Sequence, residues 1–337
     1  MTFGWLRSRR FDLSLTAGIA ALGVAAGLCA MARPAWLPWL LVLDFWLLGY
    51  HHVVATFTRL AFDRASFLEH RGLVTWLPIL VVAATCTLAF SVGVWALIST
   101  YFYWQAWHYA RQSYGLSRIY RRREGTTRLD DRLDGAVIFL VPLAGVLHRS
   151  AQGWTRFLNL DIAMVPVPAV AVPGGLALAG IAVAVWLARQ VQLTRRGTLA
   201  GAHALYLLTH VLIFGVGYVV IPDLSGGWLA LNVWHNAQYL LIVWMFNVNR
   251  FKAGETAEAP LLSAISQPRA VARYLFVQLS MGTLLFAAIL GLPSVKILAV
   301  PVVLLLSQTL NFHHYIEDAI IWKVRRPQVR VHLLTRA

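Results

Sequence analysis

The segment NFHHYIED, at residues 311–318, places two histidines and two carboxylates at the end of a long apolar run. His313 and Glu317 are four residues apart, as are His314 and Asp318, so a helix would bring each imidazole beside a carboxylate on one face. Imidazoles and carboxylates bind metal ions and transfer protons. Because ionisable side chains are costly inside a bilayer, their place in an apolar run marks a candidate functional site.

Other apolar runs of the chain also carry histidines. If these runs span a membrane, most of their histidines fall in the half nearer the cytoplasm, although successive runs cross in opposite directions, and only His210 and His235 lie nearer the middle. This shared depth predicts one metal site built from several helices. The candidate ligands are His51, His52, His108, His203, His235, His313 and His314.

Polar neighbours of these histidines could orient them. A metal-binding imidazole usually donates its second N–H to a carboxylate, amide or carbonyl. Gln112 lies four residues after His108, and Asn232 and Gln238 lie three residues on either side of His235. The side chains that we expect to orient the ligands are Asp44, Gln112, Glu317 and Asp318.

Two arginines offer positive charge near the predicted site. Asp44, His52, Arg59 and Asp63 follow one another at near-helical spacing, which predicts a polar stripe on one helix face. Arg59 or Arg111 could hold an anionic head group or a product oxygen, whereas an ion pair between Arg59 and Asp63 would be a purely structural alternative.

Each of these residues alone also fits a structural role. A buried histidine in a helix bundle is often a hydrogen-bonded core residue, and Glu317 and Asp318 could form a solvated helix end. The number of histidines, on five helices at overlapping depth, is what favours a metal site. Several imidazoles with carboxylates and no thiolate ligand indicate Fe, Zn, Cu or Ni rather than Mg or Ca. We expect one or two non-haem irons, because the histidines outnumber those of a catalytic zinc site.

Composition indicates the elements that must position these side chains. The chain has 337 residues, 59% hydrophobic and 13% charged, whereas soluble domains carry about 25% charged residues. Ten runs are long enough to span a bilayer, which predicts an all-α integral membrane bundle. The expected spans are 12–32, 36–58, 72–91, 93–117, 132–149, 168–189, 198–221, 227–249, 271–292 and 295–318.

The net charge of +15 indicates a membrane topology rather than a nucleic-acid partner. With the N-terminus in the cytoplasm, all of the 29 Lys and Arg residues face inward except Arg33, Arg149, Arg156 and Lys296. We therefore expect one multi-pass domain, 1–337, in the inner (plasma) membrane, with both termini cytoplasmic. The expected cytoplasmic loops are about 59–71, 118–131, 190–197 and 250–270, and the expected external loop is about 150–167.

Two short segments resemble known families. YWQAWHYARQ, at residues 103–112, resembles the aromatic-rich Trp-His-x-x-Arg-His segment of the bacterial Blh-type β-carotene dioxygenases, polytopic proteins whose iron is held by histidines on separate helices. This resemblance implies that His108 is an iron ligand, although Gln112 stands where their second histidine would be. FHHYIED is similar to the histidine boxes of membrane fatty-acid desaturases and hydroxylases, although the chain contains no H-x-x-x-H or H-x-x-H-H spacing.

These observations predict a membrane-embedded non-haem iron oxidoreductase of the oxygenase, hydroxylase or desaturase type. Its substrate would be a hydrophobic lipid, isoprenoid or carotenoid dissolved in the bilayer, and any electrons would come from a separate donor, because the sequence carries no flavin, haem c or iron–sulfur signature. Three alternatives stay open. They are a haem-binding electron carrier with His210 and His235 as axial ligands, a proton-coupled transporter and a zinc-dependent lipid hydrolase.

Overall fold

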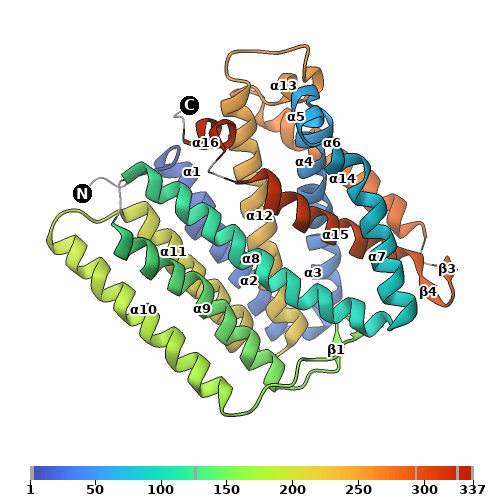
Figure 1. The fold of residues 1–337 in the computed structure, drawn as a ribbon, viewed down its shortest axis with the longest axis horizontal. Helices are drawn as coiled ribbons and strands as arrows, with labels where there is room; N and C mark the ends of the chain where they lie inside the picture. Colours follow the sequence, from blue (N-terminus) through green and yellow to red (C-terminus); the bar gives the residue numbers. More distant parts are fainter. Residues whose placement is uncertain (1–3, 125–126, 293, 324–325, 335–337) are drawn as a thin grey trace. The chain divides into compact units, whose positions relative to one another are not determined.

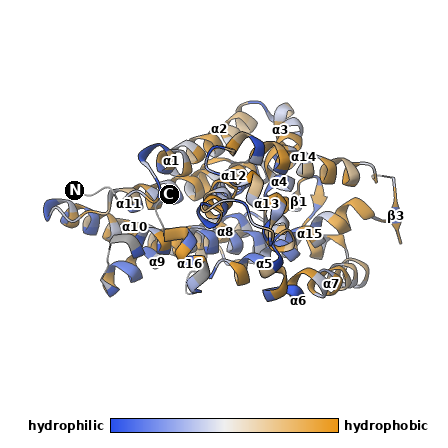
Figure 2. Ribbon diagram, turned by 90° about the horizontal axis from the view of Figure 1, so that it is seen from above, coloured by the Kyte–Doolittle hydropathy of each residue, from blue (hydrophilic) through white to orange (hydrophobic). Residues whose placement is uncertain are grey.

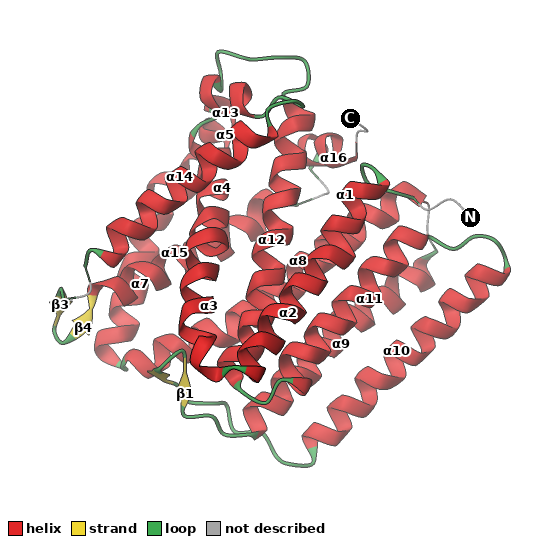
Figure 3. Ribbon diagram, turned by 180° about the vertical axis from the view of Figure 1, so that it is seen from behind, coloured by secondary structure: helices red, strands yellow, loops and turns green. Residues whose placement is uncertain are grey.

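The computed structural model describes residues 4–124, 127–292, 294–323 and 326–334. Helices make up almost all of the regular structure in these ranges, and the described strands are two-residue segments in two hairpins (Figure 3). Hydrophobic residues cover much of the ribbon (Figure 2). The predicted helical fold class is confirmed at this level.

Within the described ranges, six helices are long and apolar enough to cross a membrane. Helices also occupy the other four predicted spans, but α7 (Leu77–Ser91) is short. Histidines, amides and charged residues interrupt α8 (Val94–Glu124), α12 (Leu224–Arg250) and α15 (Val302–Ile321). Ten spans with cytoplasmic termini stay a prediction. The six helices are Arg9–Ala32, Pro34–Ala61, Arg128–Ala151, Ala171–Arg195, Gly201–Val220 and Val271–Leu290.

The described chain forms two compact units. The first unit contains residues 4–40 and 102–235, and the second contains residues 41–101 and 236–334. The helices α3 (Leu37–Asp44), α8 and α12 contribute residues to both units. The single domain over 1–337 stays a prediction.

In the first unit, α9 packs against α10 and α11, and α11 also packs against α2 (Figure 1). Thr127 caps α9 by accepting the backbone N–H of Asp130 at 3.1 Å and donating its hydroxyl to the Asp130 carboxylate. Besides the parts of α3, α8 and α12, the unit comprises α1 (Arg9–Leu13), η1 (Ser14–Gly18), α2 (Ile19–Ala32), η2 (Pro34–Trp36), α9 (Arg128–Ala151), β1 (Arg156–Phe157), β2 (Leu160–Asp161), α10 (Ala171–Arg195), α11 (Gly201–Gly215) and η4 (Val216–Val220).

In the second unit, α4 packs against α14 and α15, and α15 also packs against α7. Trp46 donates its indole N–H to Thr283 Oγ1 at 2.8 Å, which joins the segment before α4 to α14. Besides the parts of α3, α8 and α12, this unit comprises η3 (Phe45–Gly49), α4 (Tyr50–Ala61), α5 (Arg64–Glu69), α6 (Arg71–Thr75), α7, α13 (Pro260–Ile265), α14 (Val271–Leu290), β3 (Lys296–Ile297), β4 (Val300–Pro301), α15 and α16 (Pro327–Leu334).

Candidate metal centre

Two histidines from distant parts of the sequence meet in the second unit. His52 on α4 and His314 on α15 place their Nε2 atoms 3.1 Å apart, and their rings are nearly perpendicular at 84°. Both side chains are buried. Asp318 lies one turn after His314, and its Oδ2 is 3.4 Å from His314 Nε2, so a carboxylate borders the pair of imidazoles.

A chain of hydrogen bonds links the other nitrogen of His314 to the same carboxylate. Tyr239 donates its hydroxyl to Asp318 Oδ1 at 2.8 Å. The Tyr239 oxygen also lies 2.6 Å from Thr56 Oγ1, which in turn lies 3.1 Å from His314 Nδ1. Trp322 also donates its indole N–H to the Tyr239 oxygen, at 3.1 Å.

The direction of these hydrogen bonds follows from counting protons. With Asp318 ionised, Tyr239 gives its single proton to the carboxylate, so Thr56 must be the donor toward Tyr239. Thr56 then has no second proton, so His314 must donate its Nδ1–H to Thr56. The neutral imidazole of His314 therefore carries a lone pair at Nε2, the atom that faces His52.

The spacing of the two nitrogens suits either of two partners. At 3.1 Å, the Nε2–H of His52 can donate to His314 Nε2 as an ordinary hydrogen bond. A separation of 3.1 Å also falls within the ligand–ligand edges, about 2.9 to 3.4 Å, around a metal ion with bonds of about 2.0 to 2.1 Å. Paired imidazoles suit Fe, Zn or Cu.

The helix before His52 departs from regular α geometry. Phe45–Gly49 forms one turn of π-helix, η3, directly ahead of α4. Such turns add a residue and are frequent at functional sites. The buried Asp44 lies directly before this turn. His51 follows the turn with its Nδ1 3.3 Å from the Leu47 carbonyl and its backbone against Gly282 of α14.

His313 uses a different face of α15 from His314. Its Nε2 lies 2.9 Å from the Leu73 carbonyl, and its ring stacks on Phe57 at 5.3 Å with an interplanar angle of 9°. Its Nδ1 lies 3.3 Å from the buried Glu317 carboxylate. Both histidine–carboxylate pairs predicted from the i,i+4 spacing on this helix are therefore confirmed.

Arg59 lies on the same helix as His52, two turns further on. Its guanidinium lies against the rings of Phe246, at 4.2 Å, and Trp322, at 3.8 Å. Asp63, the alternative partner considered from the sequence, forms its ion pair with Arg250. Aromatic packing, rather than pairing with Asp63, thus holds Arg59 in place.

A second pair of histidines meets in the first unit. The rings of His108 on α8 and His235 on α12 lie 4.9 Å apart, and the ring of Tyr109 lies 4.4 Å from His235. Tyr109 donates its hydroxyl to Asn232 at 2.6 Å, and Gln105 donates to the same oxygen at 3.1 Å. These hydrogen bonds with Gln105 and Asn232 position the Tyr109 ring beside His235.

Gln112 and His210 occupy other places in the first unit. The Gln112 amide donates to the backbone carbonyl of His235 at 3.3 Å, so it fastens α8 to α12. His210 Nδ1 lies 2.9 Å from Ser113 Oγ, and its ring packs on Phe214 at 4.6 Å.

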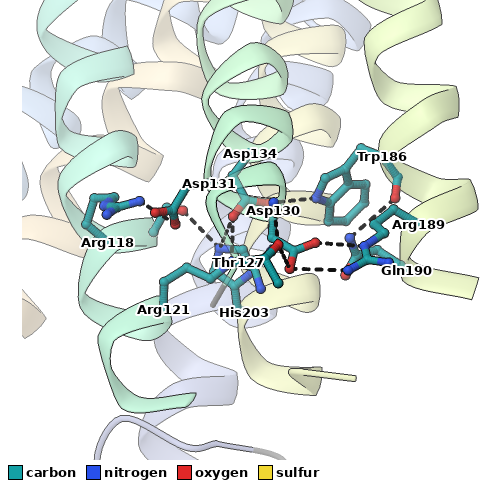
Figure 4. A network of polar contacts seen from close by, with 11 residues as sticks. Arg118, Arg121, Thr127, Asp130, Asp131, Asp134, Trp186, Arg189, Gln190 and His203 are labelled. Carbon is teal, nitrogen blue, oxygen red and sulfur yellow. Dashed lines mark hydrogen bonds and ion pairs between the residues drawn. The ribbon is translucent and has the colours of Figure 1, made fainter. Parts of the chain in front are cut away.

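His203 belongs to a buried charged cluster that joins α8, α9, α10 and α11 (Figure 4). Its Nε2 lies 2.9 Å from Ser117 Oγ and 3.6 Å from Asp134. Asp134 accepts two hydrogen bonds from Arg121, at 2.5 and 3.0 Å, and one from Trp186. The adjacent guanidinium disfavours a metal cation here. Ser117 is also nine residues, about 14 Å, along α8 from His108.

The outer part of this cluster is more exposed. Asp130 pairs with Arg189 at 2.8 Å, and Asp131 pairs with Arg118. The hydrogen bond that Arg118 donates to Asp131 raises the pKa of Arg118 above its ordinary value. The cluster fits a structural role, in which charges from four helices neutralise one another.

Sequence reasoning did not single out Thr56 or Tyr239. Each lies four residues after a histidine, Thr56 after His52 and Tyr239 after His235, so the helical periodicity that selected the carboxylates would also have found them.

No family model, curated protein or solved structure matches the chain. The arrangement of its side chains is therefore what bears on function.

Proposed function

We propose that the protein is a membrane-embedded non-haem iron oxidoreductase whose centre includes His52 and His314, with Asp318 as an orienting carboxylate. The observation that carries the proposal is the pair of buried imidazole nitrogens, His52 Nε2 and His314 Nε2, 3.1 Å apart. When Asp318 is ionised, the hydrogen bonds from His314 through Thr56 and Tyr239 to Asp318 leave a lone pair on His314 Nε2. The donor set also suits zinc, so the choice of iron rests on the histidine-rich sequence and the lipid surroundings.

Each of these side chains has a task in the proposal. His52 and His314 would hold the ion, and bound iron would supply oxygen chemistry at an apolar substrate. Asp318 stabilises positive charge on His314 through Tyr239 and Thr56, which increases the basicity of the facing nitrogen. Thr56 and Tyr239 can also pass a proton between His314 and Asp318, because consecutive oxygen and nitrogen atoms lie within hydrogen-bond distance.

The second pair, His108 and His235, is the proposed position of further metal ligands. Two observations support it, the ring contact of 4.9 Å and the resemblance of residues 103–112 to the β-carotene dioxygenase segment. In the full proposal, ten helices cross the inner membrane with both termini in the cytoplasm, the substrate is a lipid, isoprenoid or carotenoid, and a separate protein supplies electrons. The positive-inside distribution of Lys and Arg supports this topology.

The test is metal binding by protein purified in mild detergent. Apoprotein is titrated with Fe(II) and, separately, with Zn(II), for wild type, His52→Ala, His314→Ala and the control His148→Ala. His148 lies near the end of α9 beside Gln152, outside the proposed site. We expect one or two irons per wild-type and control chain, and loss of at least one of them in each site variant.

Helix content, measured by circular dichroism, tests whether all four proteins are folded. Wild-type protein without iron affinity, or His314→Ala with full affinity, would overturn the proposal. Stoichiometric zinc with no iron bound would replace it with the zinc hydrolase.

A further inference from the structure

Arg59 is a buried cation held rigidly near the end of an apolar helix. Only 6% of its surface is exposed, and its guanidinium lies against the rings of Phe246 and Trp322, at 4.2 and 3.8 Å. It lies two residues before Ala61, where the candidate membrane span Pro34–Ala61 ends. A guanidinium forms its hydrogen bonds through N–H groups at its edges, in its own plane.

Those edges are not used by the described residues. No described hydrogen-bond acceptor lies at Arg59 Nε or Nη1, although both atoms are shielded from solvent. A buried charged donor without an acceptor is strongly unfavourable, more so than an unpaired neutral group. The arrangement is therefore that of a site prepared for an acceptor that comes from outside the chain.

The nearby carboxylates are occupied by other donors. Asp318 and Asp63 are the acidic groups whose charges act on Arg59, and Arg250 adds a second positive charge. Asp318 accepts from Tyr239 at 2.8 Å and faces His314 Nε2 at 3.4 Å. Asp63 caps α5 by accepting the Ser66 N–H at 3.1 Å and pairs with Arg250. Neither carboxylate thus satisfies the two free Arg59 nitrogens.

We propose that Arg59 binds the acid group of an anionic amphiphile, a carboxylate or phosphate whose hydrocarbon tail lies in the membrane. Oxyanions are the acceptors that match guanidinium edges most strongly. The position of Arg59 near the end of a candidate span sets the acid group near the membrane surface while the tail stays in lipid.

This inference rests on the proposed function when it identifies that amphiphile as the substrate class. His52, Thr56 and Arg59 recur at three- and four-residue intervals, so they lie on one side of α4, with about 10 Å of helix rise between the first and the last. The same side of the helix therefore carries the proposed metal ligand, the hydroxyl that positions His314 and the acid-binding arginine. An acidic lipid, rather than a neutral hydrocarbon, would be the substrate.

The test compares acid and neutral probes of equal tail length. Apoprotein in neutral detergent is exposed to oleate, to oleyl alcohol, to dioleoyl phosphatidate and to inorganic phosphate, and binding is measured by native mass spectrometry. We expect oleate or phosphatidate to bind at least about tenfold more tightly than oleyl alcohol, which corresponds to a charge-assisted hydrogen bond. Comparing the two lipids identifies the acid group, carboxylate or phosphate.

Two variants and a control complete the design. Arg59→Gln should abolish the preference for the acid, and Arg59→Lys should keep part of it. The control is Arg156→Gln, which removes an exposed guanidinium whose partner is Asp161, at 2.9 Å. It should bind as wild type does. Equal binding of oleate, phosphatidate and oleyl alcohol, an undiminished preference in Arg59→Gln, or binding of inorganic phosphate alone would overturn the inference.

Iron titration of the same preparations separates the two proposals. Iron binding without an acid preference leaves the metal centre standing and removes the anion site. An Arg59-dependent acid preference without iron binding leaves an anionic-lipid site and removes the oxidoreductase.

Discussion

The Nε2 atoms of His52 and His314 lie 3.1 Å apart, although 262 residues separate the two histidines in the chain. His313, the neighbour of His314, instead directs its ring to the Leu73 carbonyl and to Phe57. The two adjacent histidines thus have different contacts, because successive residues of a helix point about 100° apart. The effect of the groups around His314 on metal binding can therefore be measured separately from the contacts of His313.

Tyr239→Phe should weaken iron binding about ten- to hundredfold, the usual effect of losing a group that orients a ligand. Without the Tyr239 hydroxyl, Thr56 is free to donate to His314 Nδ1, which moves the imidazole proton to Nε2 and removes the lone pair that faces His52. Iron titration of the apoprotein in detergent measures the effect.

Tyr206→Phe is the matched control for that experiment. Tyr206 is also buried, but among the described residues its hydroxyl donates only to the Ser113 carbonyl, at 3.4 Å. We expect wild-type iron affinity in this variant. If Tyr239→Phe and Tyr206→Phe bind iron alike, the hydrogen-bond chain has no role in metal binding.

Asp134→Asn should lower the free energy of unfolding by about 3 to 5 kcal/mol, because it leaves the Arg121 charge buried without its carboxylate. Asp131→Asn makes the same chemical change three residues earlier on α9, where the pair with Arg118 is about 30% exposed. Its cost should stay below about 1 kcal/mol. Denaturant titration in mild detergent, followed by circular dichroism, compares them, and equal costs would contradict the structural role of the Arg121–Asp134 pair.

Gly23→Ala should destabilise the first unit by about 1 to 3 kcal/mol through overpacking. A β-carbon at Gly23 would lie 2.6 Å from the backbone oxygen of Ala230 and 3.1 Å from the Trp234 side chain. At Gly180 on α10, nothing lies within 4 Å of an added β-carbon, so Gly180→Ala should change stability by less than about 1 kcal/mol. Melting temperatures of the two variants test this contrast, and a neutral Gly23→Ala would show that α2 and α12 are not closely packed.

The sequence by itself determined the helical class and the local pairs on α15. Apolar runs form helices in lipid because only a helix satisfies their backbone groups within the segment. Four-residue spacing on a regular helix likewise sufficed to pair His313 with Glu317 and His314 with Asp318, at 3.3 and 3.4 Å. These outcomes depend on covalent geometry over one or two turns.

Only the tertiary structure decided which polar side chains from different helices meet. His52 rather than His51 faces His314, and His203 joins Asp134 and Arg121. Arg59 packs against the rings of Phe246 and Trp322, and Asp63 pairs with Arg250 instead. The physical reason is that the rotation of each helix about its axis follows from packing against neighbours distant in sequence, and residue spacing carries no information about those neighbours.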